Sequence, residues 1–273
     1  MDYRKLLTRT VSGLIYCLII VLAIWWGEMG VSFMAALLCI MACVEFAKIS
    51  HDSDSGYKLT LITDIIACVL LCFAARWPLL GFFWLLTILI RFIEQLYIQE
   101  ENPVRDLAHS MLVQVWIAMP MFLMTLIAYF LWTPMLILAI FLFLWINDTG
   151  AYLVGSTMGR HRLFERISPK KSWEGSIGGF AFNMGAAVLF YFYGGHFFGI
   201  PEASIWVWLG LAATVTVFGT YGDLVESMIK RSLHIKDSGN LIPGHGGILD
   251  RIDSALLAIP AAFIYLCIWP MLD

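Results

Sequence analysis

The fold class of this 273-residue chain is decided by residues 204–270, SIWVWLGLAATVTVFGTYGDLVESMIKRSLHIKDSGNLIPGHGGILDRIDSALLAIPAAFIYLCIWP. Two apolar segments, 204–221 and 255–270, flank a segment that is rich in charge and glycine. Apolar runs of about 18 residues are long enough to cross the hydrocarbon layer of a bilayer, and shorter runs cross it only marginally. The pattern therefore predicts two membrane spans joined by a polar connection.

Similar apolar runs recur along the whole chain, in which 60% of the residues are hydrophobic and only 14% are charged. A soluble surface needs more charge than this, and the alternation typical of β-barrel strands is absent. The net charge of −3 is too small to indicate a nucleic-acid partner. We predict an all-α, polytopic membrane protein with about nine spans. They lie at 10–26, 31–47, 59–75, 78–95, 107–127, 134–154, 176–193, 204–221 and 255–270.

The distribution of Lys and Arg predicts the orientation of these spans, because cationic residues accumulate in cytoplasmic connections. If the N-terminus is cytoplasmic and the connections alternate, 16 of the 17 Lys and Arg residues fall inside and only Arg76 falls outside. We therefore expect a cytoplasmic N-terminus and an external C-terminus.

Few acidic residues lie within the predicted spans. Glu45 and Asp64 are near span ends, where each could serve a function or reach the cytoplasmic interface. Asp148 follows Asn147 in an otherwise apolar helix, and Tyr152 lies four residues further on the same face. Because an unpaired buried carboxylate is costly, we expect Asp148 to have a cation or hydrogen-bond donors, from a ligand or from neighbouring helices.

A cationic segment, GRHRLFERISPKKSWEGSIGG, follows at 159–179. The positive-inside rule and the attraction of lipid head groups, about 1 kcal/mol per cation, account for its charge. They do not account for SPKKSWEG at 168–175, where a Pro turn and two lysines precede a helix start. A helix that begins near Ser172 offers free amide groups to a phosphate, so this segment is a candidate phosphate site.

The third polar cluster begins with GDLVES at 222–227. Read as a helix, it places five polar side chains on a single face: Asp223, Glu226, Ser227, Lys230 and Arg231. Three glycines at 244–247 then permit positive φ and close backbone approach, as a phosphate-cradling loop requires. Asp250 and Asp253 follow on one face of the next helix. Such faces suit Mg²⁺ bound to a polyphosphate, although a plain turn with capping aspartates is the alternative.

These residues resemble the signature of the phosphatidate cytidylyltransferase family, also called CDP-diacylglycerol synthases. The signature has Ser, Lys-Arg, Lys-Asp, His-Gly-Gly and Asp-Arg-x-Asp at fixed spacing. Here it reads Ser227, Lys230-Arg231, Lys236-Asp237, Pro243, His245-Gly246-Gly247, Asp250-Arg251 and Asp253, without departure. The likeness extends to 222–226, 168–175 and 147–149, whereas roughly the first 130 residues match only as apolar spans.

The resemblance implies an activity in phospholipid biosynthesis, in which CTP and phosphatidate give CDP-diacylglycerol and pyrophosphate. It implies dependence on Mg²⁺, with a second cation such as K⁺, and a homodimer in a bacterial inner membrane with the site facing the cytoplasm. The family's metal-binding carboxylates carry over to Asp223 and Asp250. Attack of the lipid phosphate on the CTP α-phosphorus asks the protein mainly for positioning and charge neutralisation.

The other polar residues are assigned on this basis. Asp148 and Glu226 are additional candidates for metal ligands, and Lys230, Arg231 and Lys236 are the expected catalytic cations. The candidates for substrate binding are Lys170, Lys171, Ser172, Trp173, Ser227, Gly244, His245, Gly246, Gly247 and Arg251. We expect residues 1–130 to provide packing, dimer contacts and lipid access, and residues 131–273 to form the catalytic region with loops 155–175 and 222–254.

Three other functions are compatible with parts of this pattern. A CTP-dependent polyisoprenol kinase would transfer the γ-phosphate and release CDP rather than pyrophosphate. A CDP-alcohol phosphotransferase needs more aspartates than the single pair Asp250 and Asp253 supplies. An ion or solute transporter would place its acidic residues at mid-membrane, on broken helices in repeated halves, and no internal repeat is visible here.

Overall fold

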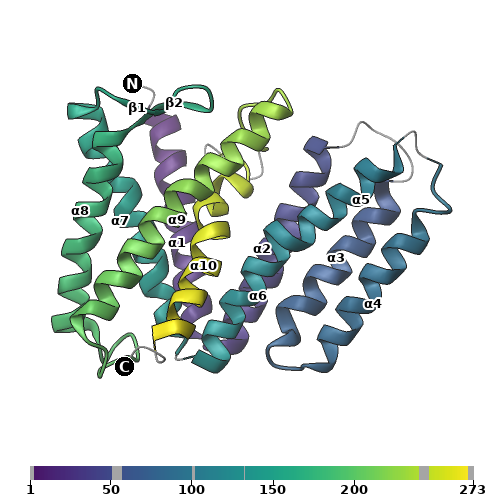
Figure 1. Cartoon of the computed structure of the whole chain (residues 1–273), viewed down its shortest axis with the longest axis horizontal. Helices are drawn as coiled ribbons and strands as arrows, with labels where there is room; N and C mark the ends of the chain where they lie inside the picture. Colours follow the sequence, from purple (N-terminus) through teal and green to yellow (C-terminus); the bar gives the residue numbers. More distant parts are fainter. Residues whose placement is uncertain (1–2, 51–56, 100–101, 132, 240–245, 270–273) are drawn as a thin grey trace. The chain divides into compact units, whose positions relative to one another are not determined.

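A computed structural model of the chain describes residues 3–50, 57–99, 102–131, 133–239 and 246–269. These residues are mostly helical (Figure 1), which confirms the predicted all-α class. The chain divides into two compact units. Unit 1 consists of Met1–Tyr129 and Asp237–Arg251, and unit 2 consists of Phe130–Lys236 and Ile252–Asp273. Two predicted substrate-binding residues, Gly244 and His245, lie outside the described residues.

Unit 1 is built from the first helices of the chain. Their bounds are α1 Tyr3–Trp25, α2 Glu28–Ser50, α3 Tyr57–Ala74, α4 Leu79–Glu94, α5 Pro103–Leu112 and α6 Met119–Leu126. The π-helical turns η1 (Val113–Ala118) and η2 (Ile127–Leu131) flank α6. Pro120 lies in the first turn of α6 and has no N–H to donate, so the wider turn η1 interrupts the regular helix just before it.

Unit 2 contains the long helices of the second half of the chain. They are α7 (Pro134–Met158), α8 (Trp173–Leu189) with the π-helical turn η3 (Phe190–Gly194), α9 (Ile205–Ser232) and α10 (Leu249–Ile268), whose residues from Ile252 belong to this unit. Strands β1 (Arg162–Phe164) and β2 (Ser168–Ser172) form a hairpin between α7 and α8. The 28 residues of α9 span about 42 Å, more than the ~30 Å hydrocarbon core, so part of this helix can extend beyond the lipid.

The helices confirm a polytopic membrane protein. Within the described parts of the chain, six helical segments are long and apolar enough to cross a bilayer. They are Glu28–Ser50, Pro103–Phe130, Pro134–Met158, Trp173–Gly194, Ile205–Ser232 and Leu249–Ile268. Each of the nine predicted spans overlaps a helix, but their number and orientation stay predictions.

A buried polar network connects three helices of unit 1. Arg91 on α4 is only 2% exposed, and its Nε donates to Ser110 Oγ on α5 at 2.8 Å. Ser110 Oγ in turn donates to Asp64 Oδ2 on α3 at 2.9 Å. Asp64, which the sequence placed near a span end, is therefore a buried partner of this network, as a carboxylate among apolar helices requires.

Helices α7 and α8 pack closely because small residues face each other. A Cβ on Gly175 would lie 2.9 Å from the backbone oxygen of Ala151, and a Cβ on Gly178 would lie 2.5 Å from Val154 Cβ. Close approach through small residues is a common way for helices to associate within a bilayer. This contact holds the start of α8 against the polar part of α7, where the candidate site lies.

We expect Gly178→Ala to destabilise the purified protein and Gly185→Ala on the same helix to leave it as stable or more so. The Gly178 methyl group would overlap Val154, which we expect to cost about 1–3 kcal/mol. A Cβ at Gly185 has no other atom within 4 Å, and Ala is the better helix former by about 1 kcal/mol. Thermal unfolding in detergent measures both variants. Equal midpoints for the pair would contradict the close α7–α8 contact.

Candidate active site

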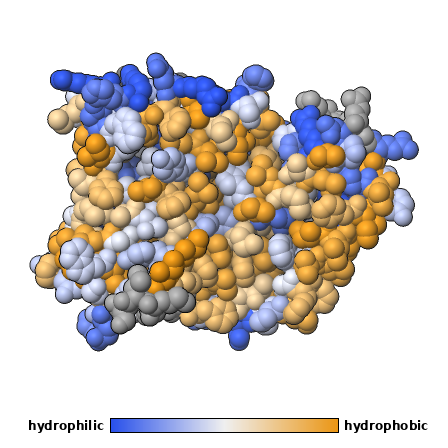
Figure 2. Space-filling model, in the orientation of Figure 1, coloured by the Kyte–Doolittle hydropathy of each residue, from blue (hydrophilic) through white to orange (hydrophobic). Residues whose placement is uncertain are grey.

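A polar cavity of about 460 Å³ lies in unit 2, between α7, β2, α8 and α9. Its lining combines cations, carboxylates, hydroxyl groups and glycines. These residues are Asn147, Asp148, Ala151, Tyr152, Gly155, Ser156, Lys170, Lys171, Ser172, Gly175, Ser176, Thr220 and Asp223. In Figure 2 the hydrophilic side chains of unit 2 gather at the end that carries the β1–β2 hairpin.

The two lysines of the cavity lie on the β-hairpin, where the sequence predicted only a connection. β1 and β2 pair antiparallel, with Arg162 opposite Ser172. They are the only strands within the part of the chain that the structure describes. Backbone hydrogen bonds between the strands fix the position of the segment that carries Lys170 and Lys171, so their charges are held beside α8.

The N-terminus of α8 is closed by side chains on both sides. Ser172 Oγ accepts a hydrogen bond from the Gly175 amide at 3.1 Å, as an N-cap residue does. Glu174 accepts from the Arg160 amide at 3.1 Å and contacts His161 Nδ1 at 2.5 Å, which connects the helix to the residues between α7 and β1. The predicted helix start is confirmed, and its amide groups and dipole face a region rich in cations.

Asp223 on α9 is held by two partners at the edge of the cavity. Its Oδ2 lies 2.6 Å from Lys171 Nζ, and its Oδ1 accepts from Ser227 Oγ at 3.2 Å. The sequence placed Asp223 and Lys171 in the same site but did not predict that they form an ion pair. This contact brings the cationic hairpin and the acidic end of α9 together.

Helix α7 contributes two polar side chains in consecutive positions to the cavity region. Asp148 lines the cavity and is exposed. Asn147 is only 4% exposed, and its Oδ1 has no hydrogen-bond partner within the described chain. A buried amide oxygen at the wall of a polar cavity is a ready acceptor for a ligand or for water.

Further acids and cations lie close to this cavity but do not line it. Lys230 Nζ lies 2.5 Å from Glu226 Oε2, one turn earlier on α9, and both side chains are nearly buried. Asp253 on α10 lies within electrostatic range of Glu226, Asp148 and Asp223. From the sequence, Asp253 was placed on an acidic face suited to Mg²⁺ and in the Asp-Arg-x-Asp motif, but it was not assigned as a metal ligand.

The other predicted residues of unit 2 take different positions. Arg231 is exposed, and its Nη1 donates to the Ile235 backbone oxygen at 3.0 Å. Lys236 is exposed in the connection that follows α9. Trp173 is 54% exposed and lines a second, apolar pocket rather than the polar cavity. The cavity thus unites only part of the predicted set, namely Asp148, Lys170, Lys171, Ser172 and Asp223.

In unit 1, Glu45 of α2 binds residues that flank the predicted glycine-rich segment on both sides. The Glu45 carboxylate accepts from the Ile248 amide at 2.9 Å, from the Leu249 amide at 3.0 Å, and from Ser238 Oγ. Glu45 is 6% exposed, so this negative charge is buried at the N-terminus of α10. The sequence left its role open between function and an interfacial position, and the structure places it inside the unit.

Asp250 belongs to the same arrangement. Its Oδ2 accepts from the Ser238 amide at 3.1 Å, from Ser238 Oγ at 3.0 Å and from the Gly247 amide at 3.0 Å. Gly246 has a φ of +86°, which favours glycine, as the sequence predicted for this turn. Arg251, a predicted substrate contact, is exposed. Because Asp250 and Asp223 belong to different units, their pairing as metal ligands stays a prediction.

The donor set of the cavity fits Mg²⁺. No group of three His, Cys, Asp or Glu side chains in the described residues is arranged to hold a metal ion by itself. Mg²⁺ in phosphate-handling sites is bound by one or two carboxylates together with substrate phosphates and water. Asp148 and Asp223 supply two carboxylates on the wall of one cavity, with two lysines beside them.

Fold and site together define a multi-pass, helical membrane protein with a cation-lined polar cavity suited to phosphate groups. Residues 7–269 match the sequence model of the Cytidylyltransferase family. The chain therefore belongs to this family, which agrees with the resemblance carried by its motifs.

Individual relatives match over a shorter region. A stretch of 131 residues is 45% identical to the phosphatidate cytidylyltransferase of Staphylococcus aureus (strain COL). A stretch of 132 residues is 43% identical to the protein of the same name from Staphylococcus haemolyticus (strain JCSC1435). Each match covers 48% of this chain and 48% of the relative, so the chain matches about half the length of these curated relatives.

Proposed function

We propose that the protein condenses CTP with phosphatidate to give CDP-diacylglycerol and pyrophosphate. The observation that carries this proposal is the cavity of unit 2, where Lys170 and Lys171 face Asp148 and Asp223. A cavity that holds both signs of charge beside apolar helices suits a reaction between a metal-bound nucleotide and a membrane lipid. Membership of the Cytidylyltransferase family and the names of the matched relatives support the same reaction.

In the proposed reaction, an oxygen of the lipid phosphate attacks the α-phosphorus of CTP. The bond between this phosphorus and the oxygen that bridges the α- and β-phosphates breaks. Pyrophosphate leaves with the electron pair of that bond. No protein nucleophile is needed, so catalysis is positioning and neutralisation of phosphate charge. Lys170 and Lys171 attract the phosphates, and the α8 N-terminus behind Ser172 adds its positive dipole.

The carboxylates of the cavity would hold Mg²⁺ at the triphosphate. Asp223 and Asp148 are the residues placed to do so, and Mg²⁺ would neutralise negative charge on the phosphates. Lys171 keeps the Asp223 carboxylate oriented toward the cavity through their ion pair. Glu226 is neutralised by Lys230, so we assign this pair the role of supporting the position of α9.

The membrane arrangement belongs to the same proposal. We place the active site on the cytoplasmic side of a bacterial inner membrane, with nine spans and a cytoplasmic N-terminus. The distribution of Lys and Arg supports this orientation, because the cavity lysines lie in one of the predicted cytoplasmic segments. The homodimer and the second cation, K⁺, rest on the family resemblance.

A single assay tests the proposed reaction. The purified full-length chain, in detergent with CTP, phosphatidate and Mg²⁺, should release pyrophosphate and form CDP-diacylglycerol, and omission of either substrate should stop release. Release of CDP when a polyisoprenol replaces phosphatidate, without release of pyrophosphate, would indicate γ-phosphoryl transfer to a lipid alcohol, as in a polyisoprenol kinase. A folded sample that forms neither product would overturn the proposal, and solute flux in proteoliposomes would then test a transporter.

A further inference from the structure

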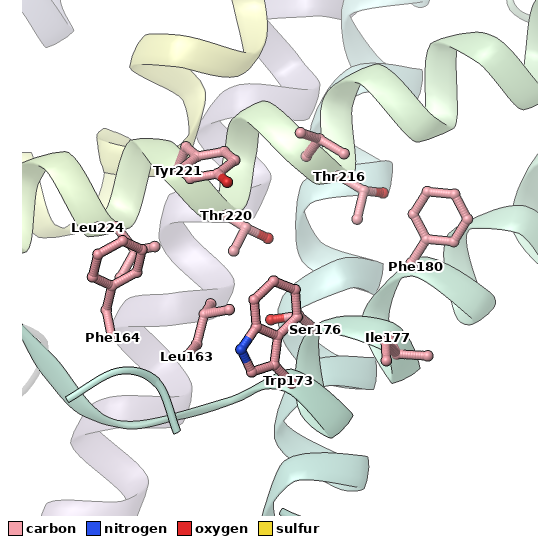
Figure 3. Close-up of a pocket in the computed structure, with 11 residues that line it drawn as sticks. Leu163, Phe164, Trp173, Ser176, Ile177, Phe180, Thr216, Thr220, Tyr221 and Leu224 are labelled. Atoms are coloured by element: carbon pink, nitrogen blue, oxygen red, sulfur yellow. The ribbon is translucent and has the colours of Figure 1, made fainter. Parts of the chain in front are cut away.

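A second pocket of unit 2 is apolar and lies between α8, α9 and the β-hairpin (Figure 3). Aromatic and aliphatic side chains form most of its wall, with a few hydroxyl groups. They are Leu163, Phe164, Trp173, Ile177, Phe180, Val217, Tyr221 and Leu224, together with Ser176, Thr216 and Thr220. Several of these side chains are well exposed, including Ile177 at 63% and Val217 at 42%, so the pocket opens to the surface of the candidate spans.

The apolar pocket and the polar cavity adjoin each other. Ser176 on α8 and Thr220 on α9 line both spaces, so these two residues mark the boundary between them. Figure 3 shows Thr220 between Trp173 and Tyr221, with Ser176 beside Trp173. A ligand that crosses this boundary would place a charged group beside Lys171 and an apolar group between α8 and α9.

We propose that the apolar pocket binds the first part of an acyl chain of the lipid substrate, with the glycerol and its ester oxygens at Ser176 and Thr220. This inference rests on the proposed function and adds a binding site for the lipid half of the reaction. A phosphate monoester with acyl chains needs a cationic region continuous with an apolar one, and the two adjoining spaces provide that combination. Ser and Thr hydroxyl groups can donate hydrogen bonds, which the ester oxygens of the lipid can accept.

The size of the pocket limits what it holds. Its volume is about 260 Å³, whereas sites that enclose a whole small molecule usually measure about 300–1,000 Å³. The pocket therefore holds the carbons nearest the glycerol, and the rest of the chain passes over the exposed side chains of Ile177 and Val217 into the bilayer. We therefore expect kcat/KM to increase with acyl-chain length among short chains and to stay constant once the chain is long enough to fill the pocket.

A cytosine ring is the other candidate occupant, because Trp173 and Tyr221 offer aromatic faces. A base also needs donors and acceptors for its polar edge, and a polar ring in an apolar wall is costly without them. Charged side chains and amides are absent from the described lining of this pocket, whereas they are present in the neighbouring cavity. The pocket chemistry thus favours an acyl chain over a nucleobase.

A chain-length series tests the inference. Pyrophosphate release by the full-length protein is measured with CTP and dibutyryl, dihexanoyl or dioctanoyl phosphatidate. For the unchanged protein, kcat/KM should rise with chain length. Val217 lies one turn of α9 away from Thr220, so Val217→Trp should occupy the part of the pocket beyond the first acyl carbons. It should lower kcat/KM for the dioctanoyl lipid by about tenfold or more, with little change for the dibutyryl lipid. Leu189→Trp is the matched control, because Leu189 is also exposed, lies on α8 and lines neither space, so its chain-length profile should stay unchanged.

Each other outcome overturns a defined part of the inference. An unchanged chain-length profile in Val217→Trp, or an equal loss with all three lipids, would remove the acyl chain from this pocket. A raised KM for CTP with an unchanged lipid profile would assign the pocket to the base instead. If the unchanged protein releases no pyrophosphate with any lipid, the proposed function fails, and the acyl site fails with it.

Discussion

Asp223→Asn is expected to reduce pyrophosphate release by about a thousandfold or more, equivalent to about 4 kcal/mol of transition-state stabilisation. Asn keeps the shape of the side chain but removes the charge that faces the cavity. Asp223 Oδ2 lies 2.6 Å from Lys171 Nζ, so the same change also releases the lysine from its partner. The site would lose a carboxylate for Mg²⁺ and the fixed position of a phosphate-binding cation in one substitution.

The matched control for this variant is Glu202→Gln, which also converts a carboxylate to an amide. Glu202 is exposed in the connection before α9 and does not line the cavity, so turnover should stay within about twofold of the unchanged protein. Thermal unfolding of both variants shows whether a loss of turnover is caused by unfolding of the protein or by the missing carboxylate. Turnover near that of the unchanged protein in a folded Asp223→Asn sample would remove Asp223 from the catalytic machinery.

The helical architecture could be predicted from the sequence because the bilayer leaves few alternatives. Backbone N–H and C=O groups in the hydrocarbon layer find no water to bind, so they must form hydrogen bonds within their own segment. Long apolar runs therefore form helices. The predicted span 134–154, for example, lies within α7. The polar segment after Gly222 was also predicted to be helical, and it forms the last part of α9, which ends at Ser232. The predicted start of α8 near Ser172 is also confirmed, because Ser172 is an N-cap with a local hydrogen-bond partner.

The partners of the polar side chains could not be predicted in the same way. Local spacing shows that Glu45 is an unusual residue in an apolar helix, but it does not show that its partners lie about 200 residues further along the chain. The ion pair between Lys171 and Asp223 likewise depends on the packing of α8 against α9. The β-hairpin was missed because its strands are short and one begins next to a proline, which gives little periodic signal.

Glu45→Ala is expected to destabilise unit 1 by about 3 kcal/mol. The carboxylate is buried and accepts from the amides of Ile248 and Leu249 and from Ser238 Oγ, and Ala leaves these donors without that acceptor. The negative charge at the start of α10 is lost as well. Thermal unfolding measures the destabilisation, and amide hydrogen exchange should accelerate at Ile248 and Leu249 before it changes elsewhere.

The exposed residue Glu28 on the same helix provides the control, because Glu28→Ala removes an identical side chain at a cost of about 0.5 kcal/mol. The consequence for activity follows from Ser238, whose hydroxyl group lies within hydrogen-bond distance of both the Glu45 and the Asp250 carboxylates. Loss of Glu45 frees Ser238 and loosens the position of Asp250, so pyrophosphate release should fall even at temperatures where Glu45→Ala stays folded. Glu45→Gln retains one acceptor oxygen, so its pyrophosphate release should lie between that of Glu45→Ala and that of the unchanged protein. If Glu45→Ala and Glu28→Ala unfold at the same temperature and exchange alike at Ile248, Glu45 does not anchor this segment.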